Sequence, residues 1–293
     1  MSLKTLLGNH AVKIYKIEQK NKLYVVVPTP DYNNEITKKF ISSLSNSKIH
    51  PSIMIVESSG REFNFSKSMN TGILEALKNN PEYIMISNND VFPTQENWAE
   101  KLINSLTAFK LTAYAVPHLI NSRSLLNVDP VIKMPNRFTV KTFTHLYPML
   151  PEKTLPLIAR IRKYFRPNNI SKTSNGSNLY KIKPPYYFLN CQPICLFKAG
   201  TLENIGYFDE KFQNGGEDFD LSIRSLLFGF KPVLSKSTIF EDIQSSTLGG
   251  GWANALYTPK KNIRASNNWR YLIDKHGNKY NKILKNGNLF YTT

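Results

Sequence analysis

Leu23–Pro30 reads LYVVVPTP, and this short run of β-branched and aromatic residues, closed by proline, decides the fold. A run of this kind predicts a buried strand that ends in a loop near Pro28. Glu35–Leu44 follows with apolar side chains at helical spacing, and Ser52–Gly60 (SIMIVESSG) repeats the pattern of a buried strand. Together the three segments predict a β-α-β unit with two parallel strands.

The alternation of strands and helices continues along the chain. Two helices are expected at Asn70–Lys78 and Thr94–Phe109, and two strands are expected at Glu82–Ser87 and Leu111–Pro117. Strands that alternate with helices favour a mostly parallel sheet covered on both faces. We therefore expect an α/β fold with a mostly parallel central sheet and helices on both faces.

The region at about 121–188 interrupts this order, because prolines break every periodic run within it. We interpret it as an insertion into one domain that spans 1–258, and we interpret 259–293 as a basic, partly helical C-terminal tail. Regular structure is expected to return at Tyr186–Phe197 and in a helix over Asp218–Phe228.

The net charge of +17 is confined to the insertion and the tail. Residues 121–188 hold twelve Lys and Arg against two acids, and residues 259–293 hold eight against one, which gives +10 and +7. Such a local excess indicates an anionic partner such as phosphate, nucleic acid or acidic lipid, although a solvated surface explains it equally well.

Several classes of protein are excluded by what the sequence contains. With 41% hydrophobic and 20% charged residues, the composition is that of a globular domain. No apolar run is long enough to span a membrane, and the first residues do not have the pattern of a signal peptide, so a cytoplasmic protein is expected. No glycine-rich phosphate loop follows any expected strand, which argues against dinucleotide redox chemistry and P-loop hydrolysis. Cys191 and Cys195 are expected to be small buried residues.

Polar side chains follow the first three expected strands. They are Thr29, Asp31 and Tyr32 after the first, Glu57, Ser58 and Ser59 after the second, and Asn88, Asn89 and Asp90 after the third. Ligands of open parallel sheets bind beyond the carboxyl ends of the strands. The oxygens of Asn88 and Asp90 suit Mg²⁺ or Mn²⁺ completed by phosphate oxygens. Asn-Asn-Asp is also favourable in an ordinary turn, so the residues alone leave both interpretations open.

A second group of acids lies in Gly206–Phe230 (GYFDEKFQNGGEDFDLSIRSLLFGF). Gly215 and Gly216 come directly before Glu217 and Asp218, and an apolar-periodic helix begins there, so the carboxylates stand at a helix N-terminus. An N-cap aspartate with a first-turn acid is the structural alternative. A general base needs a carboxylate on an element that cannot drift, and Asp218 fits that need best.

Five ordered segments resemble the inverting GT-A glycosyltransferases of family 2, in particular the rhamnosyltransferase-like branch found in bacteria and archaea. They are YVVVPTPDYNN, IMIVESSG, FNFSKSMNTGI, YIMISNNDVFP and the run from Asn190 to Pro232. The resemblance covers roughly 23–120 and 188–250 in the order and spacing of the family. It implies the GT-A fold and the inverting transfer of one sugar from a nucleotide-diphosphate sugar to a hydroxyl of a saccharide or lipid-linked acceptor.

The resemblance also implies roles for individual residues. Asp218 matches the catalytic base and Glu217 its partner. Thr29 and Asp31 fall in the loop beside the nucleoside, and Glu57 stands where the family usually has an Asp that contacts the base or ribose. Asn88-Asn89-Asp90 matches the DXD-type motif for Mn²⁺ or Mg²⁺, with Asp90 as the remaining carboxylate.

Two departures from the family pattern qualify these roles. Where many members place a metal-binding His after the next strand, this chain has Glu241 or Asp242, and we take Glu241 as the second metal ligand. The Gln-x-x-Arg-Trp signature of processive relatives is absent, since Asn268-Trp269-Arg270 does not match it. Transfer of a single sugar is therefore favoured over chain synthesis.

The basic segments fit an enzyme whose acceptor is lipid-linked. They would hold it against an anionic leaflet on the inner face of the membrane, and Leu155–Phe165 in the insertion is a candidate basic amphipathic helix. Phosphate in the acceptor itself is an equal explanation. The alternatives are a nucleotidyltransferase, a non-catalytic GT-A-like domain and a nucleic-acid-binding protein. Nucleic acid is disfavoured because it leaves Glu217-Asp218 and Asn88–Asp90 without a role.

Overall fold

The computed structural model describes residues 12–19, 21–58, 64–121, 127–128, 131–133, 179–181, 187–189, 191, 193–212, 214–243, 261–279 and 288–292. The strands are β1 (Lys13–Ile17), β2 (Leu23–Thr29), β3 (Ser52–Glu57), β4 (Tyr83–Ser87), β5 (Val91–Pro93), β6 (Thr112–Asn121), β7 (Asn127–Val128), β8 (Val131–Lys133), β9 (Leu179–Lys181), β10 (Tyr187–Leu189), β11 (Ile194–Lys198), β12 (Lys231–Asp242) and β13 (Asn288–Thr292). The helices are α2 (Glu35–Leu44), α3 (Phe65–Leu77), α4 (Trp98–Thr107), α7 (Ala199–Ile205), α8 (Glu217–Leu227) and α10 (Lys261–His276).

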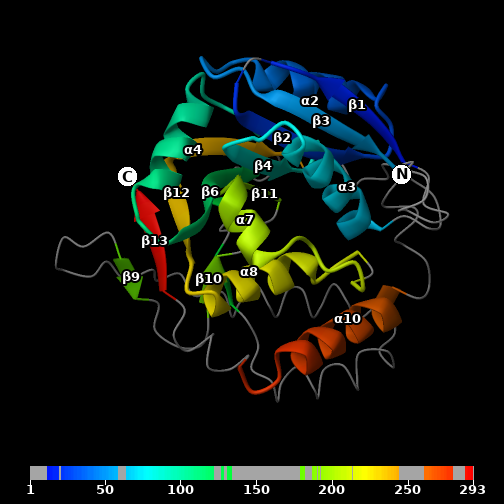
Figure 1. Cartoon of the computed structure of the whole chain (residues 1–293), viewed down its shortest axis with the longest axis vertical. Coiled ribbons are helices and arrows are strands. Elements are labelled where there is room, and N and C mark those ends of the chain that lie inside the picture. The colour runs from blue at the N-terminus through cyan, green and yellow to red at the C-terminus, as the bar shows by residue number, and fades with distance from the viewer. Residues whose placement is uncertain are drawn as a thin grey trace.

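One mixed sheet organises the described chain (Figure 1). Its strand order is β1-β3-β2-β4-β11-β6-β12-β13-β9, with β5 paired to β12 and β7 paired to β6. Strands β2, β3, β4, β6, β12 and β13 share one direction, whereas β1, β11 and β9 run against them. The expected α/β fold is confirmed, and its parallel pairing lies in two groups of strands, β3-β2-β4 and β6-β12-β13, which the antiparallel β11 joins.

Each central strand divides its side chains between two cores. In β2, Tyr24 and Val26 face one core, while Val25 and Val27 face the other. The first core is closed by α3, α7 and α8, and the second by α2 and α4. The expectation of helices on both faces is therefore confirmed, and it follows from strands that are apolar at every position.

The bounds of two helices differ from the prediction. Helix α3 begins at Phe65 and not at Asn70, because the Asn64 side chain accepts a hydrogen bond from the Lys67 N–H at 2.9 Å and so caps an earlier first turn. Helix α4 begins at Trp98 and not at Thr94. The backbone N–H of Thr94 instead donates to the carbonyl of Ile239 in β12, at 3.1 Å.

The region predicted as regular at Tyr186–Phe197 contains two separate strands. Strand β10 pairs only with β8 within the described residues, and β11 lies in the main sheet between β4 and β6. Strand β6 also runs past its predicted end at Pro117 to Asn121, where it pairs in parallel with β12.

Elements of the C-terminal segment pack on the rest of the fold. Helix α10 lies along α8, and Phe212, Ile223, Leu272 and Ile273 form a small buried core (Figure 1). Strand β13 pairs in parallel with β12. The candidate amphipathic helix Leu155–Phe165 lies outside the described residues. Among the residues that are described, none of the helices has both the length and the apolar character needed to cross a membrane.

Candidate functional site

Thr29, Thr37 and Asn89 form a hydrogen-bonded cluster where β2 ends. The two threonine hydroxyls lie 2.9 Å apart. The Asn89 amide nitrogen donates to the Thr37 hydroxyl at 3.0 Å and to the Thr29 hydroxyl at 3.3 Å. Both threonines are fully buried. Asn89 therefore joins the turn after β4 to β2 and α2, and its amide nitrogen is used within the fold.

Glu57 ends β3 beside Thr29, its register partner in β2. Its Oε2 accepts a hydrogen bond from the Tyr32 N–H at 2.9 Å and a longer one from the Tyr15 hydroxyl at 3.5 Å. The Lys13 ammonium lies 3.6 Å from Glu57 Oε1, and because Lys13 is exposed this ion pair contributes little to stability. The carboxylate of Glu57 is therefore held at the carboxyl edge of the sheet.

Of two aromatic residues beside Glu57, Tyr32 was among the polar residues expected after the first strand, whereas Tyr15 was not predicted from the sequence. Tyr15 and Tyr32 stack with ring centroids 4.0 Å apart and planes 9° apart. Tyr15 belongs to β1, whose alternating KIYKI pattern is the signal that could have found it. Asp31 is exposed, and its Oδ1 accepts a hydrogen bond from the Asn33 N–H at 2.8 Å, which forms the turn into α2.

Asp90 closes the turn between β4 and β5 and is 3% exposed. Its carbonyl accepts a hydrogen bond from the Ile243 N–H at 3.1 Å, which places it against the end of β12. The register of β5 and β12 pairs Phe92 with Glu241 and Val91 with Asp242. Because neighbouring strand residues point to opposite faces, the two candidate ligands of β12 cannot both turn toward Asp90.

The donor set for a metal ion is small. Among the described residues, no three His, Cys, Asp or Glu side chains gather closely enough to hold an ion. Asp90 with one carboxylate of β12 would supply hard oxygen ligands of the kind that Mg²⁺ and Mn²⁺ prefer. Phosphate oxygens and water would have to supply the others, as is usual for Mg²⁺.

Glu217 and Asp218 form the first turn of α8. Gly216, at φ 94°, precedes them in the left-handed region, which glycine adopts without strain. The Glu217 side chain is buried and accepts a hydrogen bond from the Gly215 N–H at 2.5 Å. Burial, and next the neighbouring Asp218 carboxylate, raise the pKa of Glu217 to about 8, so Glu217 is protonated at neutral pH.

Asp218 lies at the same edge of the sheet as the turn after β4. Its carbonyl accepts a hydrogen bond from the Cys191 thiol at 3.5 Å. Cys191 comes just before β11, which runs against β4, and the Asn88 N–H donates to the carbonyl of Pro193 at 3.0 Å. The segment Cys191–Pro193 before β11 therefore connects the backbone of Asp218 to that of Asn88.

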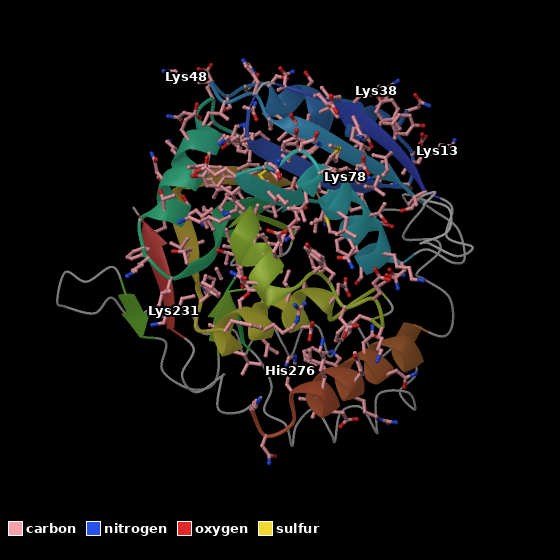
Figure 2. The ribbon with its side chains drawn as sticks, in the orientation of Figure 1. Lys13, Lys38, Lys48, Lys78, Lys231 and His276 are labelled. Atoms are coloured by element: carbon pink, nitrogen blue, oxygen red, sulfur yellow. The ribbon has the colours of Figure 1, made fainter. Side chains whose placement is uncertain are left out.

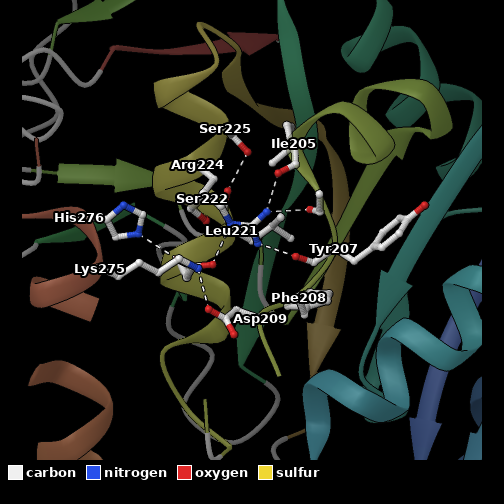
Figure 3. A network of polar contacts seen from close by, with 12 residues as sticks. Ile205, Tyr207, Phe208, Asp209, Leu221, Ser222, Arg224, Ser225, Lys275 and His276 are labelled. Atoms are coloured by element: carbon white, nitrogen blue, oxygen red, sulfur yellow. Dashed lines mark hydrogen bonds and ion pairs between the residues drawn. The ribbon is translucent and has the colours of Figure 1, made fainter. Parts of the chain in front are cut away.

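Asp220 has a structural role, and Figure 3 labels its partners Arg224, Lys275 and His276. Asp220 is fully buried and accepts hydrogen bonds from Arg224 Nε at 2.8 Å, Lys275 Nζ at 2.8 Å and His276 Nε2 at 2.9 Å. Burial by itself would raise the pKa of Asp220. The hydrogen bond from His276 and the charges of Arg224 and Lys275 outweigh it and lower that pKa to about 2. An acid so fully paired is a poor candidate for a general base.

His276 lies between α10 and α8, whereas Lys13, Lys38 and Lys48 lie near the rim of the view (Figure 2). Lys13, Lys38 and Lys48 are all exposed. The sequence did not predict that Lys275 and His276 contact α8. The signal that was present is Asp220 and Arg224 at i and i+4 on a predicted helix, which indicates an ion pair but not its further partners.

The chain was compared with known proteins. No family model matches it, and no curated protein is significantly similar to it. Among solved structures, S. aureus TarS 1-349 is similar with a TM-score of 0.40 and 10% identity, over 88% of this chain and 73% of that one. S. aureus TarS 1-349 in complex with UDP is similar with a TM-score of 0.35 and 12% identity, over 75% of this chain and 57% of that one. This chain thus spans less than two thirds of the second structure, and likeness at this level supports no assignment of function.

Proposed function

We propose that this protein is an inverting glycosyltransferase of the GT-A type. It transfers one sugar, of the hexosyl or deoxyhexosyl class, from a nucleotide-diphosphate sugar to a hydroxyl of a saccharide or lipid-linked acceptor. One observation carries the proposal: Asp218, beside the buried Glu217, lies at the same sheet edge as the Asn88–Asp90 turn. A base and a hard-oxygen site at one edge are what this reaction needs. The resemblance to the rhamnosyltransferase-like branch of family 2 supports the same conclusion.

Asp218 is the general base in this proposal. It accepts the proton of the acceptor hydroxyl as that oxygen bonds to the anomeric carbon of the donor. The bond between the anomeric carbon and the phosphate oxygen breaks, and the nucleoside diphosphate leaves with the electron pair. Attack from the face opposite the leaving group inverts the configuration. No covalent intermediate forms, so no nucleophilic Ser or Cys is required.

Glu217 keeps the pair of carboxyl groups singly charged. With its pKa raised to about 8 by burial and by Asp218, Glu217 is neutral at pH 7 and adds no second negative charge beside the base. Its hydrogen bond from Gly215 also fixes the turn that precedes Asp218. Glu217 is therefore a neutral partner that orients the base and is not itself the base.

The donor lies across the β2 and β3 ends in this proposal. Thr29, Asp31 and Glu57 flank the nucleoside, and the turn Asn88-Asn89-Asp90 faces the diphosphate. Asp90 and Glu241, or Asp242 in place of Glu241, would hold Mg²⁺ or Mn²⁺. Such an ion, when bound, neutralises the charge that develops on the departing diphosphate.

In this proposal the acceptor, or the membrane that carries it, binds to the two basic segments. Residues 121–188 carry +10 and residues 259–293 carry +7, which suits a phosphate-bearing acceptor or an anionic membrane surface on the cytoplasmic side. Vesicles of neutral and of anionic lipid separate these alternatives, because only surface attachment makes binding depend on the lipid charge and on salt.

A donor screen tests the function. The purified chain is incubated with UDP-, GDP- and dTDP-sugars, with Mn²⁺ and with EDTA, while thermal stability and release of nucleoside diphosphate are measured. A specific donor raises the melting temperature through mass action and is turned over slowly to nucleoside diphosphate. Neither stabilisation nor release with any donor argues against the proposal, and conversion of a nucleotide sugar and added pyrophosphate into nucleoside triphosphate and sugar phosphate indicates a nucleotidyltransferase.

A further inference from the structure

The segment Asp209–Asp220 carries the candidate base, and the carboxylates at both of its ends meet one lysine of α10. Lys275 Nζ lies 2.7 Å from Asp209 Oδ2 and 2.8 Å from Asp220 Oδ1 (Figure 3). The Asp209 and Asp220 side chains are largely shielded, with exposed fractions of 18% and 0%, whereas Lys275 is an exposed residue whose side chain is 26% exposed. Hydrogen bonds between charged groups in such a place are short and directional. Lys275 therefore closes the segment into a loop.

The middle of the loop also rests on α10. The Tyr271 hydroxyl donates to Asp209 Oδ2 at 2.8 Å, and its ring packs edge-on against Phe212 with the centroids 5.0 Å apart. The Lys275 ammonium lies 6.0 Å from the centre of the Phe212 ring. Tyr271 and Lys275 are one helical turn apart, so one face of α10 contacts the start, the middle and the end of the loop.

The stem of the loop is fixed from within by Arg224. Its guanidinium donates to the carbonyls of Ile205, Gly206 and Tyr207, at distances of 2.6, 2.9 and 2.6 Å, and its Nε donates to Asp220. On the opposite side, the Asn214 side chain accepts a hydrogen bond from the Phe65 N–H at 2.7 Å. The loop is thus tied to α7, α8 and α3, and Tyr271, Lys275 and His276 tie it to the C-terminal helix, where Lys275 alone of the three contacts both Asp209 and Asp220.

We propose that Lys275 is a positioning residue for the transfer reaction, which holds Asp218 in place by joining Asp209 to Asp220. This inference rests on the proposed function. Removing the ammonium leaves two like charges near each other at the ends of the loop. Asp209 then keeps hydrogen bonds from Tyr271 and the Lys211 N–H, and Asp220 keeps those from Arg224 and His276. A base that drifts by about 1 Å can lose on the order of 10²-fold in rate.

The test compares Lys275→Met with Lys279→Met. The first variant keeps the aliphatic stem and removes the charge, and the second removes an exposed lysine just beyond α10. Hydrogen exchange of peptides covering 209–220, donor affinity, and kcat are measured for both. We expect Lys275→Met to exchange faster in that segment and to lose at least about 10-fold in kcat, with donor affinity within twofold of wild type.

A conservative variant separates positioning from general stability. Lys275→Arg keeps a cation that can bridge two carboxylates, so it should restore the protection of 209–220 and most of kcat. Lys279→Met should match wild type in each measurement. If Lys275→Met proves too unstable to purify, Asp209→Asn removes the other end of the bridge at a partly exposed position, and the same faster exchange and lower kcat are expected.

Two outcomes overturn the inference. One is unchanged exchange over 209–220 in Lys275→Met, and the other is a kcat within twofold of wild type despite faster exchange. Hydrogen exchange needs no substrate. A wild-type chain that turns over no donor therefore refutes the proposed function, while the exchange data still decide whether Lys275 holds the loop.

Discussion

Glu217 is buried directly before the partly exposed Asp218 in the first turn of α8, and its pKa is raised to about 8 by burial and then by the Asp218 carboxylate. Two neighbouring acids on one helix thus differ in what they can do at neutral pH. A carboxylic acid that is already neutral resembles an amide in shape and charge. The pair therefore makes separate predictions for each residue.

Glu217→Gln should keep kcat within a few-fold of wild type at pH 7, because the amide replaces a group that is already neutral there. It should also change how stability depends on pH. The folded pKa of about 8 lies above the ordinary value of 4.5, so the wild-type side chain contributes most stability below pH 4.5 and loses it as pH rises toward 8. The melting temperature of the variant, relative to wild type, should therefore rise between pH 5 and pH 8. An offset that is the same at both pH values would contradict the buried neutral acid.

Asp218→Asn should reduce kcat by at least about 10²-fold, the usual scale for the loss of a general base. Asparagine keeps the size of the side chain but cannot accept the proton. Donor affinity, measured by calorimetry, should stay near the wild-type value. Asp274→Asn, a change at an exposed acid of α10, serves as the matched control and should leave kcat unchanged. Turnover of Asp218→Asn within a few-fold of wild type would place the base elsewhere.

The strands were predictable because a buried parallel strand is apolar on both faces. LYVVVPT and SIMIVE divide their side chains between two cores, so each appears in the sequence as a continuous apolar run. The first turn of α3 was not predictable in this way. This turn buries Ser66 and Ser68, and the Ser68 hydroxyl forms a hydrogen bond with that of Ser58 at 2.7 Å. Polar side chains therefore occupy buried positions that are usually apolar in a helix.

The positions of the candidate site residues at the strand ends were predictable for a topological reason. Parallel strands bring their carboxyl ends to one edge, so Thr29, Glu57 and Asp90 follow from the strand assignments alone. The ties of Lys275 and His276 to Asp220 were not predictable. These residues are far apart in the sequence, no local pattern couples them, and charge composition alone suggested that the C-terminal lysines face an external anion.

Gly72→Ala should destabilise the fold because α3 approaches the sheet closely at this position. A Cβ atom on Gly72 would overlap the side chain of Val26 and would lie 2.8 Å from Val56 Cγ2. Overpacking a core costs about 1 to 3 kcal/mol in the free energy of unfolding. Gly200→Ala in α7 is the matched control, since its Cβ would have no neighbour within 4 Å. Urea unfolding should show a lower midpoint only for Gly72→Ala, and equal midpoints would mean that α3 does not pack as described.

Asp90→Ala should abolish the dependence of nucleotide affinity on Mn²⁺, because the buried carboxylate at the end of β4 is the common ligand in either version of the metal site. Calorimetry of UDP, GDP and dTDP in Mn²⁺ and in EDTA measures this, and equal wild-type affinities in both would exclude a metal-assisted donor site. Glu241→Gln and Asp242→Asn test which residue is the second metal ligand. These adjacent residues of β12 point to opposite faces, so only one of the two variants should weaken the response of nucleotide affinity to Mn²⁺, and the other serves as its matched control. The variant whose nucleotide affinity depends less on Mn²⁺ therefore identifies the face of β12 that turns toward Asp90. If nucleotide affinity depends on Mn²⁺ as in wild type in both variants, neither Glu241 nor Asp242 is a metal ligand beside Asp90.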